Sequence, residues 1–318
     1  MTEKLGTLQT IDDRPLLRFE RRLAHPPEKV WRALTDPAEM RHWFPATVET
    51  EMKIGAPIRF HFEDQDLDDS EGEIVELDPP KVFAFLWDKD LLRWELVPDG
   101  DGCKLFFTHT FGGSDIWGDM VAAARHAAGW DGCLDLFSAR LDGRTEESSM
   151  DRWFERYELY VDEFGLAEGE VRDRSDGHMV RFEREFYQPV DEVWATLVEQ
   201  QNVAPGSDLP LRATNEYVTA GPVAVIEPGK LLAYPWLHEA APAGEVRWEF
   251  IAHELGCRLV LTQTVPAREP DVLATALAAW QTHLELFVAA VNGKPRPWPH
   301  ERTEELKVMY VDRLQERN

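Results

Sequence analysis

Apolar and polar residues alternate along several short segments in the first part of the chain, and this period of two is the pattern of half-buried β-strands. Leu16 to Leu23 alternates in this way and carries its charges on one face. Further alternating segments lie between Ala46 and Thr110, separated by turn-forming Gly, Pro and Asp residues. We predict strands there at Thr47–Met52, Pro57–Glu63, Glu71–Leu77, Val82–Trp87, Leu91–Val97 and Lys104–Thr110. The order is typical of an antiparallel meander.

Other segments show the 3.6-residue period of amphipathic helices. Val30, Trp31 and Leu34 form one apolar face, and Asp36-Pro37 ends that helix because the residue before a proline avoids helical geometry. The same reasoning predicts a short helix at Ala38–Trp43, a long helix at Asp119–Leu141 and a trailing helix at Arg152–Phe164.

The second half of the chain repeats this order. Pairs at one constant spacing are Phe19 and Phe182, Arg21 and Arg184, Val30 and Val193, Trp31 and Trp194, and Leu34 and Leu197. Later pairs include Trp130 and Trp280, Phe137 and Phe287, and Gly143 and Gly293. A repeat of this length indicates duplication of a whole domain. We place the first domain with its trailing helix at 1–168 and the second, diverged domain at 169–318, with the polar segment Glu168–Gly177 as linker.

The order of elements predicts the fold class. One strand, two short helices, a run of strands and a long helix are typical of an α+β domain, in which a curved antiparallel sheet wraps on a long C-terminal helix. A sheet and helix arranged in this way commonly leave a cavity between them. We therefore expect two tandem domains of this kind.

Composition narrows the range of partners. The 318 residues carry 59 acidic and 34 basic side chains, a formal net charge of −25, which disfavours nucleic acid and anionic membranes. No run of 18 apolar residues suggests a membrane span, and the first residues lack an apolar signal core, so we expect a cytoplasmic protein. The three cysteines form no metal-binding or disulfide pattern, and we expect neither metal nor cofactor. Two fused copies resemble a dimer, so we expect a monomer or weak dimer.

Several motifs of the first copy occur together in one known family. They are Pro27-x-x-Val30-Trp31-x-Ala33-Leu34-Thr35-Asp36-Pro37, Trp43-Phe44-Pro45, Thr108-His109-Thr110 and Gly129-Trp130-x-x-x-Leu134. The chain resembles, over about 15 to 145, the activator of Hsp90 ATPase homologue 1-like (AHSA1-like) domain, a branch of the START/Bet v 1 (SRPBCC) superfamily. The resemblance implies a helix-grip fold and an internal hydrophobic cavity in a soluble intracellular protein.

The second copy departs from this pattern. It has no counterpart of the Trp43-Phe44 pair, Gln263 replaces His109, and Thr282 replaces Gly132. We expect its fold to survive and ligand binding to belong mainly to the first copy.

Aromatic residues are the main candidates for a ligand site. Phe83, Phe85 and Trp87 alternate on one strand face, and other aromatics of neighbouring strands and helices would close the same cavity. The predicted ligand-binding residues are Trp43, Phe44, Phe83, Phe85, Trp87, Trp94, Phe106, Thr108, Trp130 and Phe137. The alternative interpretation is plain core packing.

His109 is the one candidate for catalysis, because an imidazole can act as a base near neutral pH. Strand alternation places it opposite Phe106 and Thr108, which predicts that it faces away from the cavity, and we interpret it as structural. The chain has no nucleophile elbow, phosphate-binding loop, dinucleotide fingerprint or HExxH motif.

Three functions stay open at this point. We favour binding of a small hydrophobic or aromatic molecule in the cavity, without catalysis. The resemblance also implies a chaperone partner, as for an Hsp90-type co-chaperone. The third is a superfamily enzyme such as a cyclase or hydrolase, which requires a polar group inside the cavity, and His109 is the residue to test.

Overall fold

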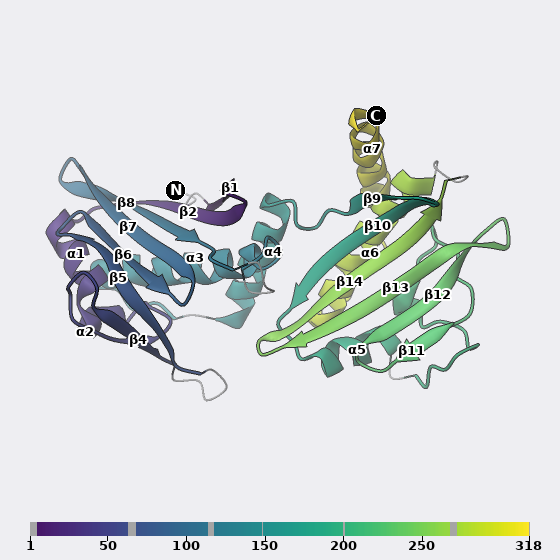
Figure 1. The fold of residues 1–318 in the computed structure, drawn as a ribbon, viewed down its shortest axis with the longest axis horizontal. Coiled ribbons are helices and arrows are strands. Elements are labelled where there is room, and N and C mark those ends of the chain that lie inside the picture. Colours follow the sequence, from purple (N-terminus) through teal and green to yellow (C-terminus); the bar gives the residue numbers. More distant parts are fainter. Residues whose placement is uncertain are drawn as a thin grey trace. The chain divides into compact units, whose positions relative to one another are not determined.

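The computed structural model describes residues 5–62, 68–113, 118–147, 149–199, 201–267 and 272–317. The chain divides into two compact units, Met1–Leu166 and Ala167–Asn318 (Figure 1). Each unit pairs one antiparallel sheet with a long helix, which confirms the predicted α+β class and the two tandem helix-grip domains.

The first unit contains an eight-stranded sheet with the order β1-β2-β8-β7-β6-β5-β4-β3. Among the described strands of this sheet, only β2 and β8 are neighbours that are distant in sequence. The strands are β1 (Thr7–Ile11), β2 (Arg14–Leu23), β3 (Thr47–Thr50), β4 (Pro57–His61), β5 (Ser70–Asp78), β6 (Val82–Trp87), β7 (Asp90–Asp99) and β8 (Gly102–Thr110). The predicted strands are confirmed within a few residues at their ends, except that Glu63 lies outside the described residues.

The local sequence explains where helices α1 to α4 of the first unit begin or end. Helix α1 (Pro27–Thr35) starts with proline, and the Asp36 carboxylate accepts a hydrogen bond from the Ala38 N–H to cap α2 (Pro37–Met40). The long helix α3 (Ala123–Leu141) ends at Gly143, whose φ of 69° suits a residue without Cβ. The trailing helix α4 (Met150–Glu163) is capped by the Ser149 hydroxyl and packs against α3.

The second unit keeps this plan with a smaller sheet, in the order β11-β12-β13-β14-β10-β9. Its strands are β9 (Glu170–Arg174), β10 (Gly177–Phe186), β11 (Val225–Glu227), β12 (Leu231–His238), β13 (Ala241–His253) and β14 (Gly256–Pro266). Its helices are α5 (Val190–Val198), the short 3₁₀ helix η1 (Leu211–Ala213), α6 (Leu273–Val291) and α7 (His300–Glu316).

Two edge strands differ from the sequence expectations. The segment predicted as a linker contains β9, which pairs with β10, and β1 pairs with β2 in the same way in the first unit. Both strands are short and mostly exposed, with the sequences TLQTI and EVRDR. Because an edge strand is paired on one side only, it can form without a strong hydrophobic pattern.

Candidate functional site

The interior of the first unit, between the sheet and α3, is packed with aromatic rings. Phe83, Phe85, Trp94 and Phe137 are at most 2% exposed. Trp94 stacks on Phe107 with ring centroids 4.5 Å apart, and Phe107 meets Trp130 at 4.8 Å. Phe85 also contacts Phe83 and Trp94, with centroids 5.3 and 5.2 Å apart, so these predicted cavity residues pack together in the manner of the core-packing alternative.

Phe106 and Thr108 lie on the face opposite the one that we predicted. In the pairing of β7 with β8, Trp94 lies opposite Phe107, so Phe106 and Thr108 point away from the interior. Arg18 covers the Phe106 ring from outside, with its guanidinium carbon 5.4 Å from the centroid. The inward residues of β8 are instead Phe107 and His109.

His109 is consequently an interior residue, not one that faces away as its alternation suggested. It is 3% exposed. The Trp130 indole N–H lies 3.0 Å from Nδ1, and the Asp90 Oδ2 lies 2.7 Å from Nε2. Because an indole nitrogen can only donate, Nδ1 must accept, which places the imidazole proton on Nε2, where it donates to Asp90. Both ring nitrogens are thus engaged within the protein.

Asp90 completes this polar chain. It also accepts a hydrogen bond from the Gly112 N–H at 2.8 Å. Burial alone would raise the pKa of Asp90, but the hydrogen bonds from His109 and Gly112 outweigh it and lower the pKa. A neutral imidazole held between a carboxylate and an indole orients Trp130 and has no lone pair left for a substrate proton.

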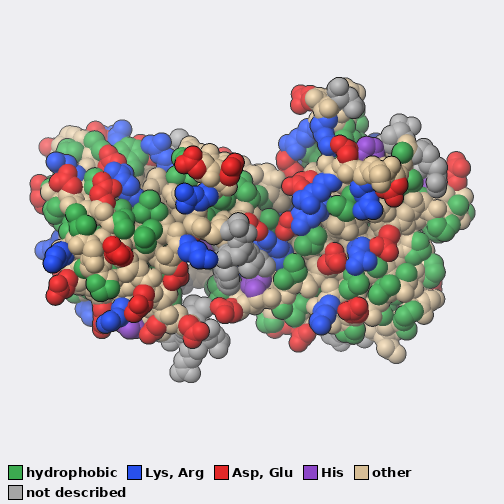
Figure 2. All heavy atoms as spheres, viewed as in Figure 1, with side chains coloured by type: hydrophobic (Ala, Val, Ile, Leu, Met, Phe, Trp, Pro, Cys, Tyr) green, Lys and Arg blue, Asp and Glu red, His purple; other side chains and the backbone are tan. Residues whose placement is uncertain are grey.

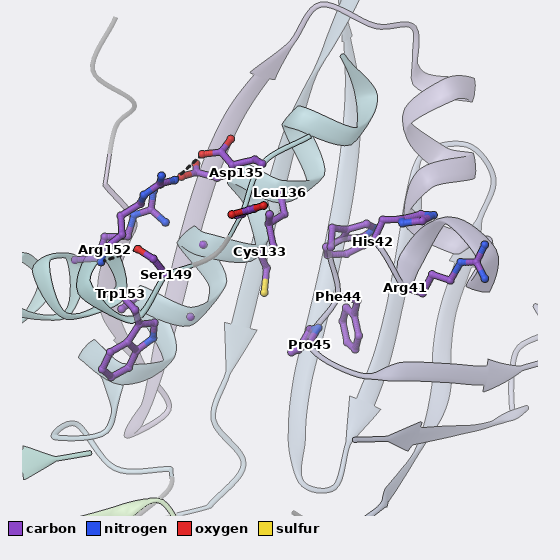
Figure 3. A pocket seen from close by; sticks show the side chains of 17 residues that line it. Arg41, His42, Phe44, Pro45, Cys133, Asp135, Leu136, Ser149, Arg152 and Trp153 are labelled. Carbon is purple, nitrogen blue, oxygen red and sulfur yellow. Dashed lines mark hydrogen bonds and ion pairs between the residues drawn. The ribbon is translucent and has the colours of Figure 1, made fainter. Parts of the chain in front are cut away.

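An open pocket lies on the outer flank of the first unit, between the Arg41–Pro45 segment, α3 and α4 (Figure 3). Its volume is about 360 Å³. The lining residues are Arg41, His42, Trp43, Phe44, Pro45, Ala128, Gly129, Gly132, Cys133, Asp135, Leu136, Glu146, Glu147, Ser149, Arg152, Trp153 and Arg156.

Two predicted ligand-binding residues connect this pocket with the core. Trp43 is 3% exposed, and its indole N–H donates to the Ala33 carbonyl at 2.9 Å. Phe44 packs on Phe60 and on Trp87, with centroids 5.9 and 5.5 Å apart. Trp43 and Phe44 therefore line the pocket and are packed against the core at the same time. The other predicted residues are not part of the pocket lining.

The floor of the pocket is formed where α3 lacks side chains. Gly129 and Gly132 are three residues apart and share one helix face. A Cβ added to Gly129 would meet no atom within 4 Å, whereas one on Gly132 would lie 3.5 Å from Arg156. Cys133 is the next residue of α3 after Gly132. Its sulfur points into the space between Trp153 and Pro45 (Figure 3). Burial raises the pKa of the Cys133 thiol to about 12, so it is a neutral lining group rather than a nucleophile.

Charged groups surround the rim in compensated pairs. Arg156 pairs with Asp135, and Arg152 Nη1 lies 2.6 Å from Glu146 Oε1. The Arg41 side chain points away from α3 and α4 (Figure 3). Because these cations are matched by carboxylates, the rim favours polar or weakly charged groups over a strong anion.

Our sequence reasoning missed most of this pocket, including Gly129, Gly132, Cys133, Leu136 and Trp153. The available signal was the pair of glycines inside a helix, where glycine is costly. A second signal was the aromatic load of the trailing helix.

Charged side chains of both signs lie on the face of each unit that Figure 2 shows, and acidic and basic side chains are interspersed there. Among the residues that the structure describes, no group of His, Cys, Asp and Glu side chains could hold a metal ion. No helix in the described part of the chain is long and apolar enough to cross a membrane.

Comparison with known protein families gives one match, which lies within the first unit. Residues 24–142 match the family model of the activator of Hsp90 ATPase homolog 1-like protein. This part of the first unit is thus similar to that family, and the sheet and long helix of the unit have the helix-grip arrangement. No curated protein matches the chain.

Several solved structures are similar to about half of the chain. CalU16 from Micromonospora echinospora is 21% identical and covers 51% of this chain and 97% of its own, with a TM-score of 0.40. EF2215 from Enterococcus faecalis is 17% identical, with coverages of 50% and 90% and a TM-score of 0.42. MLL2253 from Mesorhizobium loti is 21% identical, with coverages of 42% and 99% and a TM-score of 0.36.

Proposed function

We propose that the first unit binds a small hydrophobic or aromatic molecule in the pocket between the Arg41–Pro45 segment, α3 and α4. The observation that carries the proposal is the side-chain-free floor at Gly129, above which about 360 Å³ stays open beside Trp43 and Trp153. Glycine in a helix interior is less stable than alanine by about 1 kcal/mol. An open site beside the helix would explain why two glycines occur within one turn.

The size and lining of the pocket describe the ligand. The volume lies at the lower end of the roughly 300–1,000 Å³ range of small-molecule sites, which favours a compact ligand. Trp43, Phe44, Leu136 and Trp153 supply apolar surface, and the paired charges at the rim offer hydrogen bonds. We propose this site beside α3 and α4 because stacked rings occupy the interior between sheet and helix.

The two other functions have less support. An enzyme that uses His109 as a base would need a free ring nitrogen, and both nitrogens are engaged by Trp130 and Asp90. A chaperone partner is suggested by the family description alone. Binding without catalysis is therefore the function that we put forward.

Native mass spectrometry and ligand-detected NMR test this proposal. Freshly purified protein is weighed native and denatured, and is then titrated with toluene, indole and 1-octanol. The variant Gly129→Leu directs an isobutyl group into the pocket and should abolish the bound mass and the binding. Gly129→Ala is the matched control, because it changes helix propensity in the same direction but adds only one methyl group, and it should retain both. Binding that is equal in the wild type and Gly129→Leu, or absent from the wild type, would contradict the proposal.

A further inference from the structure

The two long helices and their trailing helices correspond residue by residue. Trp130 and Trp280 are as far apart in sequence as Tyr160 and Tyr310, so the segments between them contain no insertion. The contacts agree with this alignment: the Gly6 N–H donates to the Tyr160 hydroxyl at 2.9 Å, and the Gly169 N–H donates to the Tyr310 hydroxyl at 2.8 Å.

This alignment gives the pocket residues of α3 and α4 counterparts in the second unit. Gly129 corresponds to Ala279, Gly132 to Thr282, Cys133 to His283 and Trp153 to Thr303. Ala279 and Thr282 are fully buried, His283 is 5% exposed and Thr303 is 1% exposed. The groove that is open beside α3 is thus filled beside α6.

A tryptophan of the second unit fills this groove. The Trp298 indole N–H donates to the Thr303 hydroxyl at 3.0 Å. Its ring stacks on Tyr217, with centroids 5.8 Å apart and planes at 29°, and meets the His283 ring at 6.0 Å. Thr303 in turn donates to the Thr282 hydroxyl at 3.0 Å, which ties α7 to α6.

The surroundings of Trp298 match the walls of the first pocket. His283 and Thr303 are the counterparts of Cys133 and Trp153, which line the pocket in the first unit. Tyr217 belongs to the segment between α5 and β11, and Pro45 belongs to the corresponding segment that follows α1 and α2. The indole of Trp298 therefore lies where the first unit is open.

We propose that the pocket of the first unit takes a planar aromatic molecule of two fused rings with a hydrogen-bond donor on its edge, and that Trp298 is a built-in copy of this ligand in the second unit. The inference rests on the proposed function, since it names the ligand class of that site. A flat ring fits between Trp153 and Pro45, over the Gly129 floor. The Ser149 hydroxyl and the Asp135 and Glu146 carboxylates supply acceptors for the donor, in the role that Thr303 has for Trp298.

Indole is the probe that tests this, compared with naphthalene and 1-octanol on the full chain by NMR titration. Indole should bind the wild type about fivefold more tightly than 1-octanol, because ring stacking adds to buried area. It should also bind more tightly than naphthalene, which lacks the donor. Gly129→Leu should remove this binding and Gly129→Ala should keep it.

The variant Trp298→Gly tests whether the Trp298 indole occupies a site that could otherwise bind a ligand. Removing the indole side chain should create a second indole site, detected as a doubled stoichiometry in native mass spectrometry. Trp298→Leu is its control, because it removes the ring but keeps apolar volume, and it should gain no site. If Trp298→Gly loosens the second unit, added indole should restore the hydrogen-exchange protection of α6 peptides.

The outcomes separate the two proposals. Gly129-sensitive binding in which 1-octanol equals or exceeds indole would overturn the aromatic class and leave the binding function standing. The absence of any Gly129-sensitive binding would overturn both. A Trp298→Gly protein that neither gains a site nor is protected by indole would overturn the role of Trp298.

Discussion

The groove between the long helix and its trailing helix is a pocket in the first unit and part of the core in the second. In the first unit it is bordered by Gly129, Cys133 and Trp153, with α4 held to α3 by the pair of Arg156 with Asp135. In the second unit Thr282, Thr303 and the ring of Trp298 close it through hydrogen bonds and stacking. One helix pair can therefore carry an open pocket or a filled core, depending on a few side chains.

The same comparison extends to the polar contacts beneath the helices. In the first unit, buried Arg21 forms an ion pair with buried Asp131, and Arg156 approaches the same carboxylate at 3.6 Å. In the second unit, the counterpart of Asp131 is Gln281, which accepts a neutral hydrogen bond from Tyr310 at 2.6 Å. At this position the buried carboxylate of the first unit is thus replaced by a neutral amide in the second unit.

The largest effect should come from breaking the charged contact. Asp131→Ala leaves the Arg21 guanidinium buried without its carboxylate, which should lower the free energy of unfolding of the first unit by about 3–5 kcal/mol. Gln281→Ala is the matched change in the second unit and should cost about 1 kcal/mol. Urea unfolding followed by hydrogen exchange on peptides of each unit measures both. Equal losses in the two units would show that the ion pair has no special weight.

Acid should distinguish the units next. Burial lowers the pKa of His283 to about 4, while its hydrogen bond to the Arg212 carbonyl acts in the opposite direction. The unfolded chain, with a histidine pKa near 6.5, binds this proton more readily. Stability should therefore be complete above pH 6.5 and fall by about 3 kcal/mol as the pH drops to 4.

The matched variant for this prediction is His283→Gln, which keeps a donor for the Arg212 carbonyl but does not titrate. Its second unit should lose less stability over the same pH range, as measured by urea unfolding at pH 7 and pH 4. The first unit has Cys133 at this position, and its thiol stays neutral throughout the range. The same acid sensitivity in wild type and variant would contradict the buried-histidine account.

A smaller difference is expected at the indole contacts in the two cores. His109 accepts from Trp130, and its counterpart Gln263 accepts from Trp280 at 2.6 Å. His109→Gln should therefore lower the free energy of unfolding by less than about 1 kcal/mol. His109→Leu leaves the Trp130 N–H without its acceptor and should lower it by about 2 kcal/mol. Thermal unfolding of the two variants measures the difference. Ligand binding in His109→Gln should match the wild type. A loss of binding would mean that His109 takes part in the ligand site.

The sequence predicted the fold well because strand alternation and the domain repeat agreed at every long element. It assigned the wrong face to β8 because both faces carry comparable residues, Phe106 and Thr108 outside and Phe107 and His109 inside. The edge strand β9 was taken for a linker since its exposed residues show no apolar period. Hydrophobic patterns identify core residues. They do not identify a pocket whose floor consists of glycines, which have no side chains.

The pocket illustrates this limit. Trp43 and Phe44 were identified because aromatic residues are conspicuous, and both line it. The remaining walls depend on how α4 packs on α3, which is a tertiary contact that local periodicity does not encode. Besides the two glycines within α3 and the aromatic residues of α4, the comparison of Gly132 with Thr282 pointed to this helix face.

The smallest effect should come from the glycine floor itself. Gly129→Ala should raise the stability of the first unit by about 1 kcal/mol, because alanine favours the helix and its Cβ meets no neighbouring atom. The reverse change, Ala279→Gly, should lower the stability of the second unit by about the same amount or more, since Ala279 is fully buried. Urea unfolding of each variant measures the pair. A Gly129→Ala protein that is less stable than the wild type would mean that the floor is closed to even one methyl group, and the space needed for a ligand would then be in doubt.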